Sequence, residues 1–193
     1  MKGTIHYCLE ELMLEKYGQE AWDKCVQLMG YEEGHSFDLA IRDDIDEKES
    51  INLFVKSAEA ANVSLGQIFD DFGEHWSVVY APNLYGAFFQ GSNSTKDALL
   101  NLDWVHSVVT KKIENARPPR FHYDRLDENV IEIEYKSNRH LIDLFISLIK
   151  GLHKKYNDHS LIEKLSESKV RLTFNTDETK VVDKSNAEVS AEA

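Results

Sequence analysis

Apolar residues recur at every third or fourth position through the first half of the chain, which is the spacing of helices with one buried face. Residues 4–29 show this pattern first, and Gly18 predicts a break between two helices there. The spacing returns in residues 43–62, 64–81 and 94–116, each opened by acidic or hydroxyl side chains that suit a helix start. The pattern predicts an N-terminal half made of helices.

The pattern changes at "RPPRF", because neither proline can donate to a helix ladder and the preceding helix must end. Residues 120–126 and 129–136 look like two strands joined by a short turn. Residues 139–156 then predict a helix, and residues 169–175 predict a last strand. The second half is therefore of mixed α and β character. Residues 176–193 are small and polar, so we expect a disordered tail or a linker there.

The composition is that of one soluble globular domain, since 193 residues allow a sizeable core and 42% are hydrophobic. The formal net charge of −12 argues against nucleic acid and anionic membranes as partners, because both bind clustered Lys and Arg. No apolar run approaches the roughly 20 residues of a membrane span, and no secretion signal is visible. Cys8 and Cys25 lack metal-ligand spacing, so we expect a reduced, cytoplasmic protein.

One of the eight histidines stands on a helical face that is otherwise apolar. His106 lies on or beside the face that carries Leu99 and Val109. Such a histidine, taken alone, is more often a satisfied core residue than a ligand. No second His, Cys or carboxylate follows three or four positions later, so a zinc site on this helix is poorly supported. A single neutral imidazole is, however, what one axial position of a haem iron requires.

The junction between the second strand and the following helix, "EYKSNRHL", carries three polar side chains at alternate positions. Tyr135, Ser137 and Arg139 would share one face of a strand, so their donors could converge on the same anion. Arginine can fork onto a carboxylate with two parallel hydrogen bonds. The alternative is a polar strand end with Arg139 in a surface ion pair. The chain shows neither a Gly-rich phosphate loop nor a recognisable nucleophile–base pair.

The stretch "YKSNR" resembles the Y-x-S-x-R motif of the haem nitric oxide/oxygen-binding (H-NOX) family, the sensor fold also found in soluble guanylate cyclase. Other segments resemble this family in the same order: "MKGTI" at the start, "FGEHW" at 72–76 and "NLDWVHSVV" around His106. In "ARPPRF", Pro119 lies thirteen residues after His106, where the family places a proline against the porphyrin. The resemblance extends over residues 1–175 and leaves residues 176–193 as a tail or linker.

This resemblance implies an α+β fold, in which a helical N-terminal subdomain packs on a C-terminal subdomain with a small antiparallel sheet and helices. Haem b (iron protoporphyrin IX) would lie between them. His106 would bind the iron, and the three motif residues would hold the haem propionates. Leu144 stands where the family places a distal tyrosine, and a leucine offers bound dioxygen no hydrogen bond. The other implied pocket residues are Ile5, Leu9, Trp76, Tyr80, whose hydroxyl could act as a donor, and Leu148.

The resemblance further implies a gas sensor without enzymatic activity of its own. Nitric oxide, and also carbon monoxide, would bind opposite His106, and nitric oxide would weaken the iron–histidine bond and so release the helix. The output partner would be a histidine kinase or a cyclic-di-GMP enzyme, or a fused signalling module. A haem enzyme such as a peroxidase, a dioxygen-binding protein, and a cofactor-free interaction module in which His106 is a core residue are the alternatives.

Overall fold

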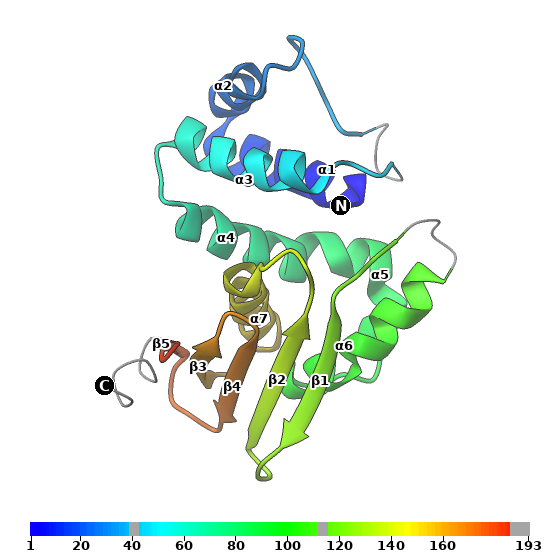
Figure 1. The fold of residues 1–193 in the computed structure, drawn as a ribbon, viewed down its shortest axis with the longest axis vertical. Coiled ribbons are helices and arrows are strands. Elements are labelled where there is room, and N and C mark those ends of the chain that lie inside the picture. The colour runs from blue at the N-terminus through cyan, green and yellow to red at the C-terminus, as the bar shows by residue number, and fades with distance from the viewer. Residues whose placement is uncertain (39–42, 112–115, 186–193) are drawn as a thin grey trace.

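The helical and the sheet-containing parts of the chain lie at opposite ends of the molecule, which confirms the α+β class (Figure 1). The computed structural model describes residues 1–38, 43–111 and 116–185. The helical part comprises α1 (Gly3–Leu12), the π-helical turn η1 (Met13–Tyr17), α2 (Gln19–Met29), α3 (Glu47–Ala61), α4 (Leu65–Glu74), the π-helical turn η2 (His75–Tyr80) and α5 (Ala81–Phe89). The other part comprises α6 (Thr95–Thr110), β1 (Arg120–Arg125), β2 (Val130–Lys136), α7 (Ile142–Tyr156), β3 (Ser160–Ser166), β4 (Lys169–Phe174) and β5 (Lys180–Asp183).

Polar side chains and one glycine explain where several helices begin. The Ser64 hydroxyl accepts a hydrogen bond from the backbone N–H of Gln67 at 3.1 Å, at the start of α4. Ser94 does the same for Asp97 at the start of α6, also at 3.1 Å. The sequence predicts the Ser64 cap and leaves Ser94 or Thr95 for the second helix, of which the structure selects Ser94. A hydroxyl there satisfies an N–H that has no partner in the helix. Gly18 has a φ of 83° and separates η1 from α2, as predicted.

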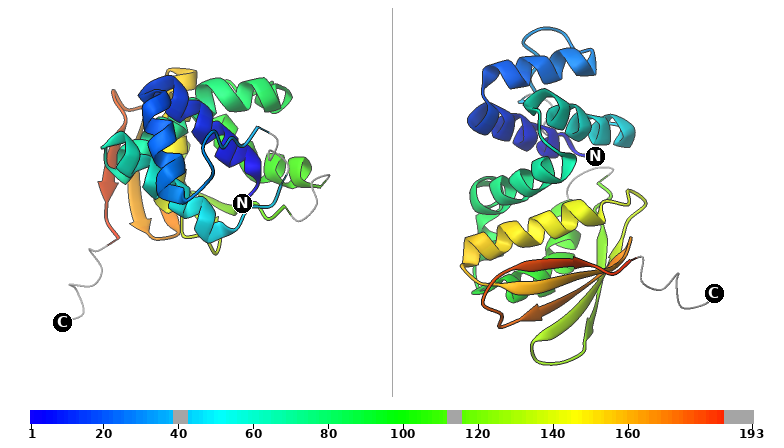
Figure 2. Two further views of the ribbon diagram at one scale, coloured as in Figure 1. Left: turned by 90° about the horizontal axis from the view of Figure 1, so that it is seen from above. Right: turned by 90° about the vertical axis from the view of Figure 1, so that its left-hand side faces the viewer.

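The sheet has the strand order β1-β2-β4-β3-β5. All neighbouring pairs are antiparallel except β3 and β5, which are parallel. Helices α6 and α7 pack on the sheet, and their side chains enter one core together with the inward residues of the strands (Figures 1 and 2). Ile131, Ile133 and Tyr135 alternate along β2 and all belong to this core, as the period of two requires.

Three elements depart from the sequence expectation. Strand β5 falls within residues 176–193, and the expectation of a disordered tail or linker is wrong for Lys180–Asp183, which pair with β3. The pattern does not predict β3, because the buried positions of this strand include Ser160 and Lys164 and hide its apolar alternation. Helix α5 includes Pro82 in its first turn, where proline is tolerated, although the sequence suggested a stop. Residues 112–115 and 186–193 lie outside the described residues.

The buried apolar residues form two separate cores. One core joins α1–α4 and includes Leu9, Phe72 and, from α7, Leu144. The other lies between the sheet and helices α6 and α7 and includes Phe145. Two consecutive residues of α7 therefore belong to different cores. Within the described parts of the chain, no helix is long and apolar enough to cross a bilayer.

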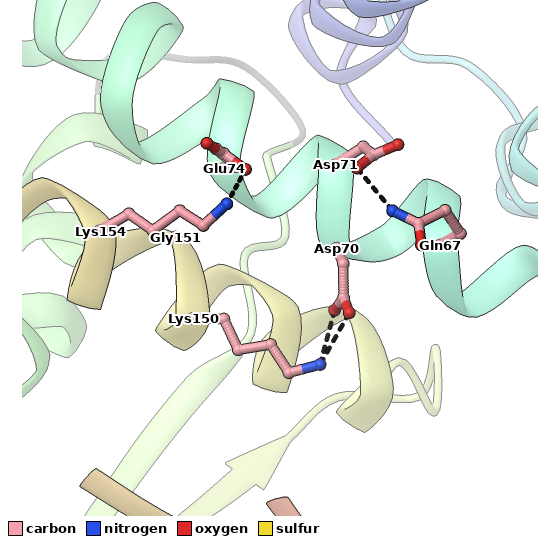
Figure 3. Close-up of a pocket in the computed structure, with 7 residues that line it drawn as sticks. All are labelled: Gln67, Asp70, Asp71, Glu74, Lys150, Gly151 and Lys154. Carbon is pink, nitrogen blue, oxygen red and sulfur yellow. Dashed lines mark hydrogen bonds and ion pairs between the residues drawn. The ribbon is translucent and has the colours of Figure 1, made fainter. Parts of the chain in front are cut away.

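Helices α4 and α7 connect the two cores by crossing at a pair of glycines. A Cβ atom at Gly73 would overlap the backbone of Ser147, and one at Gly151 would overlap the backbone carbonyl of Gly73. Ion pairs from Asp70 to Lys150, at 2.8 Å, and from Glu74 to Lys154 flank the crossing and line a cleft of about 210 Å³ (Figure 3). The contact is between backbones, so no larger residue fits at either glycine.

We expect Gly151→Ala to lower the free energy of unfolding by about 1–3 kcal/mol, because the new methyl group must push α4 away from α7. Urea unfolding followed by circular dichroism measures this change. Gly86→Ala is the matched control, since its Cβ would meet no atom within 4 Å. Equal stability of the two variants would contradict the tight crossing.

Candidate functional site

The three polar residues at the β2–α7 junction lie together. Tyr135 is buried in the sheet core, with its ring 5.9 Å from that of Phe121 and 5.8 Å from that of Phe145. Burial raises the pKa of Tyr135, so the phenol keeps its proton, and its hydroxyl is hydrogen-bonded to the side chain of Ser137. The Ser137 hydroxyl also accepts the backbone N–H of Arg139 at 3.2 Å. The junction thus presents two hydroxyls and one guanidinium from a stretch of five residues.

Arg139 reaches from this junction to the helical part of the molecule. Its Nε donates to Oε1 of Glu47, at the first residue of α3, at 2.9 Å, and its Nη1 donates to the backbone carbonyl of Arg117 at 2.9 Å. The Arg139 side chain is only 13% exposed, whereas that of Glu47 is 48% exposed. The guanidinium thus binds a half-exposed carboxylate through one hydrogen bond and a carbonyl through another, rather than one carboxylate through two. This is an ion pair, as in the alternative expected from the sequence, but its arginine is mostly buried. The role of Arg139 toward propionates stays a prediction.

His106 lies three turns along α6, with its ring half-buried beside Phe121 at 5.4 Å between ring centroids. Its Nδ1 is 3.2 Å from the backbone oxygen of Pro119. A carbonyl can only accept a hydrogen bond, so Nδ1 carries the proton and Nε2 of the neutral ring keeps a free lone pair. Burial lowers the pKa of His106, which keeps the ring neutral. This is the state in which a histidine binds a metal.

Phe121 connects His106 to the polar junction, because its ring contacts both His106 and Tyr135. Asp103, one turn before His106, accepts the Phe121 N–H at 2.9 Å and pairs with Arg120 at 2.5 Å. This pairing holds α6 beside β1. His106 and the Y-x-S-x-R residues are thereby brought to one region of the molecule, although about thirty residues separate them in sequence.

The other predicted pocket residues lie in or at the edge of the helical core. Leu9 and Leu144 are buried in it, and Ile5, Trp76, Tyr80 and Leu148 are half-buried against it. The Trp76 ring stacks on the Tyr80 ring at 5.3 Å. The Tyr80 hydroxyl lies 3.0 Å from the hydroxyl of Thr4, and burial raises the Tyr80 pKa. These side chains are mainly apolar, and their polar groups include the hydroxyls of Tyr80 and Thr4 and the indole N–H of Trp76.

Two residues of the site are not predicted from the sequence. Glu47 is a partner of Arg139 from 92 positions earlier, and no local pattern marks it among the neighbouring acidic residues. Phe121 sits on the buried side of the alternation in residues 120–126, which is the signal that could have placed it next to His106. Pro119 contributes a backbone oxygen to His106, whereas the sequence suggested only contact through its ring.

Comparison with known proteins decides the family. The chain matches the sequence model described as Haem-NO-binding over residues 2–164. The chain belongs to this family. Soluble guanylate cyclase gcy-37 of Caenorhabditis elegans is 26% identical over 159 residues, which are 80% of this chain and 22% of that protein. The chain thus spans less than a quarter of the length of this curated relative.

Solved structures of H-NOX domains agree with this membership. A Cs H-NOX mutant with 4-cyano-L-phenylalanine at site 5 is 26% identical and has a TM-score of 0.80, covering 93% of this chain and 100% of that one. An oxygen-binding H-NOX domain related to soluble guanylate cyclases is also 26% identical, with a TM-score of 0.76 over 91% of this chain and 96% of that one. The fold of this H-NOX chain is therefore that of haem-binding sensor domains.

The residues present suit a haem as the bound group. His106 offers one neutral imidazole with an available nitrogen, and Arg139 already holds a carboxylate. The aromatic rings of Phe121 and Tyr135 lie between the imidazole and the rest of the junction. Among the described residues, no three His, Cys, Asp or Glu side chains come together as a metal cluster would require. An iron that brings its own four nitrogen ligands needs only one imidazole, which is what this H-NOX chain supplies.

We expect Arg139→Lys to lower the free energy of unfolding by about 1–2 kcal/mol, because lysine cannot donate to Glu47 and the Arg117 carbonyl at the same time. Urea unfolding of the haem-free protein measures this loss. Arg125→Lys, at an exposed position of β1, is the control and should change stability little. If Arg139→Lys loses no more stability than Arg125→Lys, the contacts of Arg139 do not stabilise the connection between the helical and the sheet-containing parts.

Proposed function

We propose that this H-NOX chain is a haem-based sensor of nitric oxide in the cytoplasm. His106 binds the iron of haem b through Nε2. The observation that carries this proposal is the bond from His106 Nδ1 to the Pro119 carbonyl, because it aims a neutral imidazole and fixes its tautomer. When bound, haem supplies an open coordination position for a gas. Membership of the Haem-NO-binding family supports the same conclusion.

Tyr135, Ser137 and Arg139 hold the haem propionates. Two carboxylates brought into a largely apolar site need donors, because an unpaired buried charge costs several kcal/mol. The two hydroxyls and the guanidinium of the junction supply them. The Glu47 side chain is 48% exposed, so its carboxylate remains solvated if Arg139 leaves it to bind a propionate. Pro119, next to His106, presses on the porphyrin.

Leu144 determines the choice of gas. Its side chain is buried in the helical core and carries no hydrogen-bond donor. Bound dioxygen is polar and depends on a donor, whereas nitric oxide and carbon monoxide depend on one much less. Ile5, Leu9 and Leu148 complete an apolar wall, and Trp76 closes it on the side of η2. The site therefore favours nitric oxide and carbon monoxide.

Binding of nitric oxide is transmitted through α6. Release of His106 frees the last turns of this helix, and the helical part then shifts against the sheet part across the α4–α7 crossing. Such a switch needs a contact that differs between the two states, and the bond to His106 is that contact. The chain itself performs no catalysis. Its output is a histidine kinase or a cyclic-di-GMP enzyme, by analogy with the family, or a fused module, for which the larger soluble guanylate cyclases that it resembles are a precedent.

A dioxygen-binding protein is the second candidate, and one observation favours it. The Tyr80 hydroxyl pairs with Thr4 at 3.0 Å beside the wall that carries Ile5. Burial raises the Tyr80 pKa, so the phenol keeps a proton that it can donate. One similar solved structure is an oxygen-binding H-NOX domain. A dioxygen complex in this chain would then depend on Tyr80.

The first test removes the iron ligand. We expect His106→Gly to bind haem with an affinity at least tenfold lower than that of the wild type. Added imidazole should occupy the space left by the missing side chain and restore a spectrum like that of the histidine-bound haem. The iron–histidine stretch in the resonance Raman spectrum of the ferrous protein should be present in the wild type and absent from the variant. His122→Gly, at an exposed position of β1, is the control. A stretch that survives in His106→Gly would assign the ligand to another residue.

The second test concerns gas choice. We expect ferrous wild type to bind nitric oxide and carbon monoxide but to form no stable dioxygen complex, and Leu144→Tyr to slow dioxygen release at least tenfold. Stopped-flow absorption spectroscopy measures both. Tyr80→Phe separates the two candidates, because it should leave a nitric oxide sensor unchanged. A stable dioxygen complex in the wild type that Tyr80→Phe abolishes would favour the second candidate.

A further inference from the structure

The first residue of α6 is tied to the turn after α7 by a partly buried carboxylate, that of Asp158. Thr95 donates its backbone N–H to Oδ2 of Asp158 at 2.8 Å and its hydroxyl to Oδ1 at 2.6 Å. Thr95 is fully buried, and Asp158 belongs to the short turn between α7 and β3. One carboxylate thus closes on a helix start with two hydrogen bonds, where the helix dipole also favours a negative charge.

Asp158 is itself held in place by the buried side chain of His153, which is held in turn by buried Ser160. Nδ1 of His153, in the last turn of α7, donates to Oδ1 of Asp158 at 2.7 Å. Nε2 of the neutral ring accepts the hydroxyl of Ser160, the first residue of β3, at 2.8 Å. The order Ser–His–Asp resembles that of a hydrolase, but Ser160 is 0% and His153 is 3% exposed, so no substrate can reach them. The network positions α6 rather than acting on a ligand.

The opposite end of α6 is held far less firmly. His106 lies eleven residues after Thr95, or about 16 Å along the helix axis. Between them, Asp103 accepts the Phe121 N–H at 2.9 Å and pairs with Arg120, whose side chain is 55% exposed, so solvent screens the ion pair. The buried residues of α6 are Thr95 and Leu99, and its later residues are half-buried or exposed. The first turn of α6 is thus its best-anchored point, and the turns around His106 depend on the bond to iron and on the Pro119 carbonyl.

We propose that Asp158 is a positioning residue that makes Thr95 the fixed pivot of α6. This inference rests on the proposed release of His106. When His106 is released, α6 swings about its buried start instead of sliding along the sheet. A displacement about a fixed end grows with distance from that end, so the turns after His106 move most. The Asp158 network thereby converts a local event at the iron into a directed movement of the C-terminal end of α6.

Hydrogen exchange tests this pivot in haem-loaded protein. In the wild type, we expect nitric oxide to speed amide exchange at residues 106–110 at least tenfold and to leave the amides of residues 95–99 unchanged. In Asp158→Asn and Thr95→Val, the acceleration should extend to residues 95–99. Ser94→Ala is the matched control, because it removes the ordinary cap on Asp97 but leaves the contact between Thr95 and Asp158. The Asp97 amide of this variant should exchange faster both with and without nitric oxide, because it loses its acceptor, but the change caused by nitric oxide should match that of the wild type.

The outcomes separate the pivot from the proposed function. A wild type in which nitric oxide accelerates exchange equally at residues 95–99 and 106–110 overturns the pivot, and this result needs no variant to fold. The pivot is also overturned if nitric oxide changes amide exchange at residues 95–99 in Asp158→Asn no more than it does in Ser94→Ala. A wild type that binds no haem, or that keeps the iron–histidine stretch with nitric oxide bound, instead overturns the release of His106 on which the pivot rests. The ferrous spectrum recorded before the exchange experiment distinguishes these cases.

Discussion

The hydrogen bond from His106 to the Pro119 carbonyl is the interaction on which the site depends. A histidine can present either nitrogen to a metal, and a backbone oxygen at 3.2 Å removes that choice. The same bond joins α6 to the segment that leads into β1, so the direction of the imidazole is set by the fold. Burial keeps the ring neutral and thereby complements the bond. Without this constraint, the half-buried ring would be an ordinary boundary residue of an amphipathic helix.

The imidazole lies in the sheet part of the molecule, beside Phe121, and two separately packed cores meet along α7. The helical core and the sheet core share few elements, and the crossing of α4 and α7 at two glycines brings their backbones into direct contact. Arg139 adds a polar connection across the same boundary through Glu47. Under the proposed function, a cofactor held by His106 and Arg139 would contact both parts of the molecule, so a change in its bonds would alter how they sit together. A small ligand would thereby have a mechanical effect.

The parts that the sequence predicts are those whose causes are local. Ser64 and Ser94 cap the helices that follow them, and "YKSNR" gathers its donors within five residues. The order of helices and strands follows from periodicity. The parts that the sequence hides depend on distant partners. Glu47 contacts Arg139 only in the folded chain. Strand β5 forms because it pairs with β3, and its four exposed residues show no apolar alternation that would predict a strand.

Leu144 and Phe145 follow one another on α7 yet face different cores. Successive helical residues point about 100° apart, so this helix serves as a common wall for both. A larger or smaller side chain at 144 therefore also alters the packing of Phe145 and the strands beneath it. If Leu144 selects the gas as proposed, a substitution that changes gas preference also changes the packing between the two cores.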